Sequence, residues 1–308
     1  MNCLTKLFQQ KRRRIDYILA FSGPMISKRD SSDLCNYNDE TNDIMNIKKI
    51  HLAYYSATFS TRRVVREIAA HFQNPVKEYD ITSEVLKDEV SLGSDGDLLI
   101  VGVPSYAGRV PEMAVRSLRR FLGNNTPAII VCVYGNRAYD DTLIELKDLM
   151  ESHGFKLLSA AAVIAQHSIF PEVAEGRPDA DDMAKLHDFA SKSRELLIQI
   201  PKMSAVSRLM VKGNRPYRTT KPIPLHPEGC KGKCTSCHAC VKMCPADAIT
   251  MEEPYKTNEK KCISCGRCVV VCPEHARHFG GLLYKAASWK FEKAFAEPKQ
   301  PEFFYVKS

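Results

Sequence analysis

Between residues 48 and 200, short apolar runs alternate along the chain with segments of helical pattern. The runs at 97–103 and 128–133 are apolar almost throughout, as expected of parallel strands that are covered on both faces. Pro111 stands at the start of one helical segment, where proline is well tolerated. The pattern predicts strands at 50–55, 76–79, 97–103, 128–133 and 157–164, and helices at 62–72, 111–121, 140–153 and 179–200.

This alternation of strands and helices predicts an α/β domain over residues 47–200, built on a doubly wound parallel sheet of five strands. Ligands of such sheets bind beyond the carboxyl ends of the strands. The loops that follow the first, third and fourth predicted strands are therefore the candidate binding site.

The loop after the first predicted strand is rich in hydroxyl groups and leads directly into a helix. Hydroxyls in that position can hold a phosphate, together with backbone N–H groups and the helix dipole. The loop contains no Lys or Arg, which favours a flavin monophosphate over a nucleoside triphosphate. The candidate phosphate-binding residues are Ser56, Thr58, Ser60 and Thr61.

The loops after the third and fourth predicted strands combine aromatic residues with glycines. Two such loops can sandwich a flat ring, and backbone exposed at glycine can approach its polar edge. The candidate flavin-binding residues here are Pro104, Ser105, Tyr106, Gly108, Tyr134, Gly135 and Asn136.

Residues 230–279 contain the same cysteine pattern twice, C-x2-C-x2-C-x3-C-P. In this bacterial ferredoxin run, the fourth cysteine of each block binds the cluster of the other block. The pattern predicts two [4Fe–4S] clusters and a small α+β domain. Paired C-x2-C motifs also bind zinc, but zinc needs four ligands and each block offers a third cysteine at the same spacing and a fourth before proline. One cluster is assigned to Cys234, Cys237, Cys240 and Cys272, and the other to Cys262, Cys265, Cys268 and Cys244.

The length of 308 residues fits two domains with tails. Four of the twelve cysteines fall outside the cluster pattern, namely Cys3, Cys35, Cys132 and Cys230. Cys132 lies in an apolar strand and is expected to be a buried small side chain. Iron–sulfur ligands and free thiols indicate a reducing, cytoplasmic location. No run of 18 apolar residues is present, so no transmembrane segment is expected.

The net charge of +8 comes from the cysteine-rich half, because residues 201–308 carry 19 Lys and Arg against 9 Asp and Glu. A basic region raises the question of nucleic-acid binding, but no recognition motif accompanies the charge. We expect instead that it steers acidic redox protein partners. The oligomeric state is not predicted.

Three further segments have their own character. Residues 1–46 start basic and become rich in Ser, Asp and Asn, which predicts a disordered extension; a transit peptide and a start codon placed upstream of Met45 are the alternatives. Residues 201–229 form a basic linker with regularly spaced prolines, which predicts an extended and stiff connection. Residues 280–308 comprise a predicted helix at 282–295 and a tail. The helix is aromatic and basic, and docking on the domains is favoured over membrane binding.

The three loops of the α/β region resemble those of flavodoxin. The order of a flavodoxin-like domain followed by a two-cluster ferredoxin domain resembles the flavodoxin–ferredoxin fusion proteins of anaerobic bacteria, over about residues 45–308. The resemblance implies an electron-transfer protein. Phe59 stands where flavodoxins have glycine, so a requirement for positive φ would make this position costly.

We therefore expect an iron–sulfur flavoprotein that passes low-potential electrons between two [4Fe–4S] clusters and FMN, without a catalytic side chain. One alternative is a flavin-dependent reductase of a quinone or another small acceptor. The other is a ferredoxin module on a flavin-free scaffold that docks a partner. Of the other single residues, His167 follows the fifth predicted strand and is expected to be structural.

Overall fold

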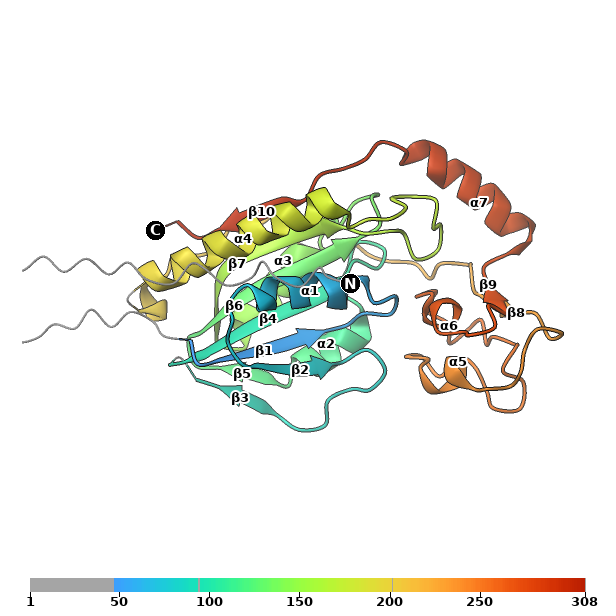
Figure 1. The fold of residues 1–308 in the computed structure, drawn as a ribbon, viewed down its shortest axis with the longest axis horizontal. Helices are drawn as coiled ribbons and strands as arrows, with labels where there is room; N and C mark the ends of the chain where they lie inside the picture. The colour runs from blue at the N-terminus through green and yellow to red at the C-terminus, as the bar shows by residue number, and fades with distance from the viewer. Residues whose placement is uncertain (1–46, 94, 201, 308) are drawn as a thin grey trace, which may run out of the picture. The chain divides into compact units, whose positions relative to one another are not determined.

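The computed structural model describes residues 47–93, 95–200 and 202–307 (Figure 1). The predicted disordered extension at 1–46, with Cys3 and Cys35, lies outside the described residues.

A six-stranded sheet, in the order β10-β7-β6-β4-β1-β2, forms the centre of the α/β domain. All pairs among its first five strands in the chain are parallel. The order of those five is that of the flavodoxin-like doubly wound sheet, which confirms the predicted fold class. The five strands are β1 (Lys49–Tyr54), β2 (Val76–Asp80), β4 (Asp97–Pro104), β6 (Thr126–Tyr134) and β7 (Phe155–Ile164).

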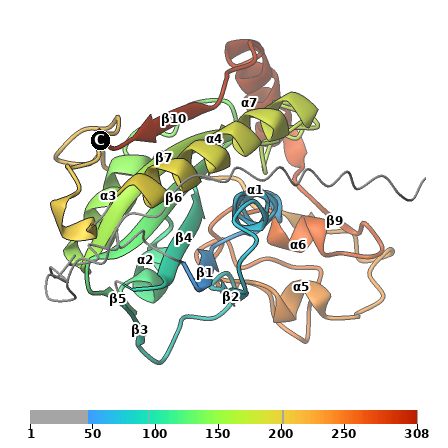
Figure 2. The ribbon, with the colours of Figure 1, turned by 60° about the vertical axis from the view of Figure 1, so that its left-hand side comes forward.

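Helices cover both faces of this sheet. On one face α1 and α4 lie side by side, and on the other α3 packs on β6 and β7 with α2 beside it (Figures 1 and 2). Every residue of β6 is buried, as expected for a central strand covered on both faces. The helices are α1 (Ser60–Ala70), α2 (Glu112–Leu118), α3 (Thr142–Ser152) and α4 (Ala180–Gln199).

The sixth strand comes from the C-terminal tail and was not expected from the sequence. β10 (Glu302–Tyr305) pairs antiparallel with β7, outside the five parallel strands. It has four residues, too few for a clear alternating pattern. Phe303 stacks on Phe189 of α4, with ring centroids 5.0 Å apart. Two short strands, β3 (Val90–Leu92) and β5 (Phe121–Gly123), pair separately.

The linker after α4 follows the surface of the α/β domain. It begins with a 3-10 turn, η1 (Met203–Ala205). Asp141, at the start of α3, accepts hydrogen bonds from the backbone N–H of Asn214 (2.8 Å) and of Arg218 (2.7 Å). The Arg215 guanidinium binds the Asp148 carboxylate. These contacts fix the middle of the linker on the loop after β6 and on α3.

The cysteine-rich region contains little regular structure. It has two one-turn helices, α5 (Ala239–Lys242) and α6 (Arg267–Val270), and an antiparallel pair of β8 (Glu228–Gly229) with β9 (Arg277–His278). The longer helix α7 (Gly281–Ala294) follows. Its Tyr284, Phe291 and Phe295 pack on a small apolar cluster around Phe170, which agrees with the docking interpretation. Among the described residues, no helix is both long enough and apolar enough to cross a membrane.

Candidate functional site

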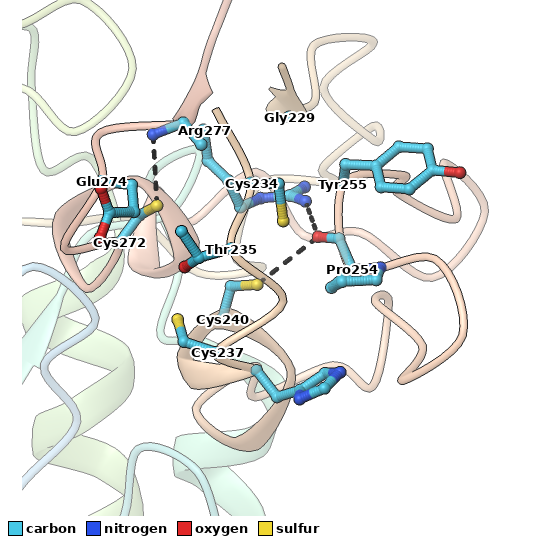
Figure 3. Close-up of a pocket in the computed structure, with 12 residues that line it drawn as sticks. Gly229, Cys234, Thr235, Cys237, Cys240, Pro254, Tyr255, Cys272, Glu274 and Arg277 are labelled. Carbon is cyan, nitrogen blue, oxygen red and sulfur yellow. Dashed lines mark hydrogen bonds between the residues drawn. The ribbon is translucent and has the colours of Figure 1, made fainter. Parts of the chain in front are cut away.

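Two small cavities in the cysteine-rich region are lined by thiols. Cys234, Cys237, Cys240 and Cys272 line the first (Figure 3). Cys244, Cys262, Cys265 and Cys268 line the second. The eight cysteines thus divide into the two sets that the spacing predicts, with the fourth cysteine of each block in the cavity of the other. In the described part of the chain, no three Cys, His, Asp or Glu side chains converge on a single metal ion. A cubane needs no such point, because each of its thiolates binds a different iron.

The two cysteine blocks repeat the same backbone conformations, which explains why each surrounds a cavity in the same way. Ser236 and Ser264 share positive φ values of 53° and 56°. His238 (φ 60°) directly precedes α5, and Gly266 (φ 76°) directly precedes α6 in the same left-handed conformation. These left-handed turns reverse the chain between consecutive cysteines, so that the first three sulfurs of one block face the same cavity.

Two thiols of the second cavity, those of Cys265 and Cys268, are buried. Burial raises the pKa of Cys265 to about 12 and that of Cys268 to about 11. Free thiols there would stay protonated at neutral pH, so only a bound cation or cluster makes thiolates favourable. Backbone N–H groups already point at some of the sulfurs, such as that of Ala248 at Cys244 Sγ (3.3 Å) and that of Ala276 at Cys272 Sγ (3.3 Å).

Arg277 holds the first cavity together from inside the cysteine-rich region. Its guanidinium is buried and donates hydrogen bonds to the carbonyl oxygens of Pro254 (2.7 Å) and Pro227 (2.9 Å) (Figure 3). Pro254 O also accepts from Cys240 Sγ at 3.5 Å. No sequence pattern indicated this residue, because it lies beyond the last cysteine of the repeat.

The loop after β1 places hydroxyl groups at the start of α1. Ser56 Oγ accepts the Arg62 N–H at 3.0 Å and so closes the loop onto the first turn of the helix. Thr58 and Ser60 line an open cavity of about 830 Å³, with Arg62 on the same wall. The first turn of α1 carries no acidic residue, and the side chain of its N-cap residue Phe59 makes no capping hydrogen bond. The positive end of the helix dipole therefore opens onto this cavity, as a phosphate site requires.

Flavodoxins have glycine at the position of Phe59, which suggested a positive φ there. Phe59 adopts this left-handed conformation, with φ 66° and ψ −7°. For a residue with a bulky side chain this conformation costs about 1–2 kcal/mol. Its ring contacts two guanidinium groups, whose central carbons lie 4.7 Å (Arg62) and 4.5 Å (Arg267) from the ring centroid. Each such contact contributes about 0.5–2 kcal/mol, which offsets the backbone strain.

The loop after β4 contacts the buried Tyr55 on one side and the start of α3 on the other. The Tyr106 ring meets the buried ring of Tyr55 edge-on, with centroids 6.1 Å apart. Pro104 ends β4, and Ser105 Oγ is hydrogen-bonded to Thr142 Oγ1 at 2.7 Å. At Gly108 (φ 84°) a Cβ atom would collide with Asp140.

The loop after β6 points mainly toward other parts of the chain. Tyr134 is buried and packs on Tyr139, at 5.3 Å. At Gly135 a Cβ atom would collide with the His167 ring. Among the predicted phosphate-binding residues, Ser56 and Thr58 lie in the loop after β1, and Ser60 and Thr61 lie in the first turn of α1. Tyr106 lies beside Tyr55, and Tyr134 is buried. Their contacts with FMN stay predictions.

Asn136 has a second role that its position in the sequence did not reveal. Its buried amide donates to the carbonyl oxygens of Phe295 (2.8 Å) and Glu297 (2.9 Å) and accepts the Lys299 N–H (3.0 Å). It therefore fastens the segment that leads from α7 to β10.

Replacing Asn136 with alanine is expected to lower the free energy of unfolding by about 2–4 kcal/mol, because the three hydrogen bonds of its buried amide are lost. Urea unfolding measures the loss, and hydrogen exchange of residues 295–299 is expected to rise. The exposed Asn124, changed to alanine, is the matched control. Equal stability of the two variants would contradict this role.

His167 is half-buried against aromatic rings of the loop that follows β7 and of α7. Its ring stacks on Phe170 at 5.2 Å and lies 4.7 Å from Phe291. Nδ1 accepts the N–H groups of Ile169 (3.2 Å) and Phe170 (3.1 Å), so the proton of the neutral ring is on Nε2. Burial lowers the pKa of His167 to about 4.

This pKa predicts a loss of stability in weak acid. Below pH 6.5 the unfolded chain takes up a proton on this ring, which the folded chain resists until about pH 4. The stabilisation is complete above pH 6.5 and falls by up to about 1.4 kcal/mol per pH unit as the pH drops toward 4. Urea unfolding at pH 7 and pH 5.5 is expected to show a loss about 1 kcal/mol larger in the unmodified protein than in His167→Leu. Parallel losses in both proteins would contradict the assignment.

Comparison with known proteins addresses both parts of the chain. Residues 233–276 match the family described as the 4Fe-4S dicluster domain. The chain is a fusion of a flavodoxin-like domain and a 4Fe–4S dicluster domain. The first assignment rests on the strand order of the sheet, and the second on the cysteine region that the family matches. The fusion thus carries a domain type that binds 4Fe–4S clusters.

The solved structures that are similar to this chain share little sequence identity with it. Rubredoxin oxygen:oxidoreductase from Desulfovibrio gigas is 16% identical, with a TM-score of 0.35, over 50% of this chain and 37% of that one. A short-chain flavodoxin associated with a non-canonical PDU bacterial microcompartment is 16% identical, with a TM-score of 0.37, over 49% of this chain and 99% of that one. Fusobacterium nucleatum flavodoxin bound to flavin mononucleotide is 14% identical, with a TM-score of 0.35, over 48% of this chain and 98% of that one. No curated protein matches the chain.

Proposed function

We propose that the fusion is an electron-transfer protein that binds two [4Fe–4S] clusters and one FMN. The proposal rests on the position of Cys265. It lines the second thiol cavity and packs in one apolar cluster with Tyr55 and Tyr106, at the strand ends where a ligand of this fold binds. Cluster ligands and the candidate flavin loops are therefore neighbours.

Two four-thiol cavities support the binding of two clusters. Each cavity offers the four cysteine ligands of a cubane. The backbone N–H groups directed at the sulfurs, and the guanidinium of Arg277, lower the electrostatic cost of the anionic thiolates.

Three observations support FMN. The start of α1 opens without a carboxylate onto a cavity whose volume lies in the range of cofactor sites. Thr58 and Ser60 present hydroxyls there. The buried Tyr55 hydroxyl has no hydrogen-bond partner among the described residues, although buried polar groups are normally paired. In this arrangement Thr58, Ser60 and the α1 N–H groups would hold the phosphate, and Tyr106 would contact the ring. When bound, the clusters supply one-electron chemistry and the flavin one- or two-electron chemistry.

A second candidate is a ferredoxin module on a flavin-free scaffold. It is favoured because groups of the candidate flavin loops already bind other residues of the chain. Arg267 covers the carbonyl groups of Ser56 and Ala57, and Asn136 is fully used by the C-terminal segment. Flavin content separates the two candidates.

The experiment uses the full chain, prepared without oxygen and incubated with FMN. Fluorescence quenching of FMN on titration with the protein measures binding. A carrier is expected to exchange electrons rapidly with a reduced ferredoxin or flavodoxin and to turn over quinones slowly. Rapid quinone turnover would instead identify a flavin-dependent reductase. Absence of flavin binding would leave the docking scaffold.

The partner and the location are part of the same proposal. We propose acidic redox proteins as partners, because the chain from residue 201 onward is strongly basic. Exchange rates with such partners should then fall as salt is added. We propose a reducing cytoplasm as the location, from the iron–sulfur ligands and the free thiols.

A further inference from the structure

Arg267 lies in the second cysteine block, yet its side chain binds the α/β domain. It is 3% exposed, and its Nη1 donates to the carbonyl oxygens of Ser56 (2.9 Å) and Ala57 (3.1 Å). Both acceptors belong to the loop after β1. A guanidinium with so little contact with water must gain its hydrogen bonds from protein groups. Arg267 therefore joins a cysteine loop to the candidate phosphate loop by buried, charge-assisted bonds.

Phe59 adds a second contact to Arg267. The centroid of its ring lies 4.5 Å from the Arg267 guanidinium and 4.7 Å from that of Arg62 in α1. The residue that departs from the flavodoxin pattern is thus the one that receives the arginine of the cysteine domain. We define Arg267 and Phe59 as the clamp.

Two other residues of the same cysteine loop, Gly266 and Ser264, also lie close to the α/β domain or to the linker. At Gly266 (φ 76°) a Cβ atom would lie 3.0 Å from Ser168 O and 3.5 Å from Thr58 Cγ2. The buried Ser264 hydroxyl donates to Leu225 O of the linker. The loop is therefore held by the α/β domain, by the loop after β7 and by the linker.

The two thiol cavities differ in their surroundings as a result. Cys265 of the second cavity is buried in the apolar cluster that contains Tyr55 and Tyr106. Cys237 of the first cavity is exposed. Cys240 of the first cavity and Cys268 of the second share a small apolar cluster with Ile249, which connects the cavities.

We propose that the clamp of Arg267 and Phe59 fixes the order of the two centres. The cavity of Cys244, Cys262, Cys265 and Cys268 is the inner centre, next to the flavin loops, and the cavity of Cys234, Cys237, Cys240 and Cys272 is the outer centre, which exchanges electrons with the partner. Arg267 is a positioning residue. The order of centres rests on the proposed function, but the clamp itself does not require a flavin.

The test is hydrogen–deuterium exchange of the full chain carrying its clusters, read by mass spectrometry at residues 54–61 and 264–268. Arg267→Met is expected to raise exchange in both segments by at least about tenfold, because hydrogen bonds and a cation–π contact are lost together. Phe59→Leu, which lies outside the cysteine domain, is expected to raise it by a smaller factor. The double variant is expected to exchange no faster than Arg267→Met, since both residues act in one contact.

Arg277→Met is the matched control. Arg277 is equally buried, but its hydrogen bonds stay within residues 227–257. It is expected to increase exchange near Pro254 and to leave residues 54–61 unchanged. If Arg267→Met fails to retain iron, Phe59→Leu decides the question. Exchange like that of the unmodified chain at residues 54–61, in an iron-loaded Arg267→Met or in Phe59→Leu, would overturn the clamp.

The order of centres has its own readout. In the dithionite-reduced protein, a gadolinium(III) chelate on an unnatural amino acid at position 70, which dithionite does not reduce, reports distances by pulsed EPR to a single remaining cluster. Ala70 is exposed and is the last residue of α1, in the α/β domain. With the outer centre removed by Cys234→Ala and Cys237→Ala, the distance is expected to be shorter than with the inner centre removed by Cys262→Ala and Cys265→Ala. The reverse order of distances would overturn the assignment, whether or not flavin binds.

Discussion

Replacing Cys262 and Cys265 together by alanine is expected to halve the iron content, from about eight atoms per chain to about four, because two of four ligands of one cubane are lost. Replacing Cys234 and Cys237 together is expected to have the same effect on the other cubane. The two variants should retain different centres, which EPR spectra of the reduced proteins distinguish. Cys244→Ala should alter the centre that depends on Cys262, because both line the second cavity.

Cys230→Ala is the control for this series. Cys230 is exposed and lines neither thiol cavity. It is expected to leave the iron content at that of the unmodified chain. An iron content that stays full in the Cys262 and Cys265 variant would show that these thiols are not ligands. About two tightly bound zinc ions per chain, without acid-labile sulfide, would favour zinc sites instead.

Changing Ser60 to aspartate is expected to weaken FMN binding strongly while leaving the fold intact. Ser60 is the first residue of α1 and lines the cavity of about 830 Å³. A carboxylate there repels the phosphate dianion, which corresponds to an affinity loss on the order of 100-fold at close range. The same carboxylate interacts favourably with the helix dipole and contributes about 0.3–1 kcal/mol to stability. Binding and stability should therefore move in opposite directions.

FMN titration and thermal unfolding of the same preparations measure both effects. Ser60→Ala is the matched control, because it removes only the hydroxyl, and it is expected to weaken binding by about tenfold or less. Binding of FMN by Ser60→Asp with unchanged affinity would place the phosphate somewhere else. Loss of stability in Ser60→Asp would mean that the backbone N–H groups in the first turn of α1 do not interact favourably with a negative charge at this position.

Four of the five parallel strands could be predicted because they are largely apolar, whereas β2 is short and mostly exposed. The alternation of strands with helices leaves few arrangements. The cysteine blocks were equally informative, since their spacing alone predicted which thiols share a cavity. Short elements could not be predicted in this way. β10 has only four residues and forms through pairing with β7 and packing on Phe189, which are contacts far apart in the sequence.

The flavin loops show a second limit of sequence patterns. Tyr134 and Asn136 have the residue types and the position of a ring-binding loop, but the pattern cannot show that the C-terminal segment uses Asn136. Phe59 was recognised as a departure from flavodoxin, whereas its reason, the guanidinium of Arg267, lies about two hundred residues away in the chain. Buried arginines such as Arg267 and Arg277 have no local signature, because their partners are backbone carbonyl groups.

Iron, acid-labile sulfide and extracted flavin, counted on one sample purified without oxygen and incubated with FMN, test the central claim most directly. The account predicts about eight irons, about eight sulfides and about one FMN per chain, as two cubanes and one flavin site require. Full iron and sulfide without flavin would contradict it. The loop around Phe59 would then serve only to receive Arg267, and the fusion would be a ferredoxin module on a docking scaffold.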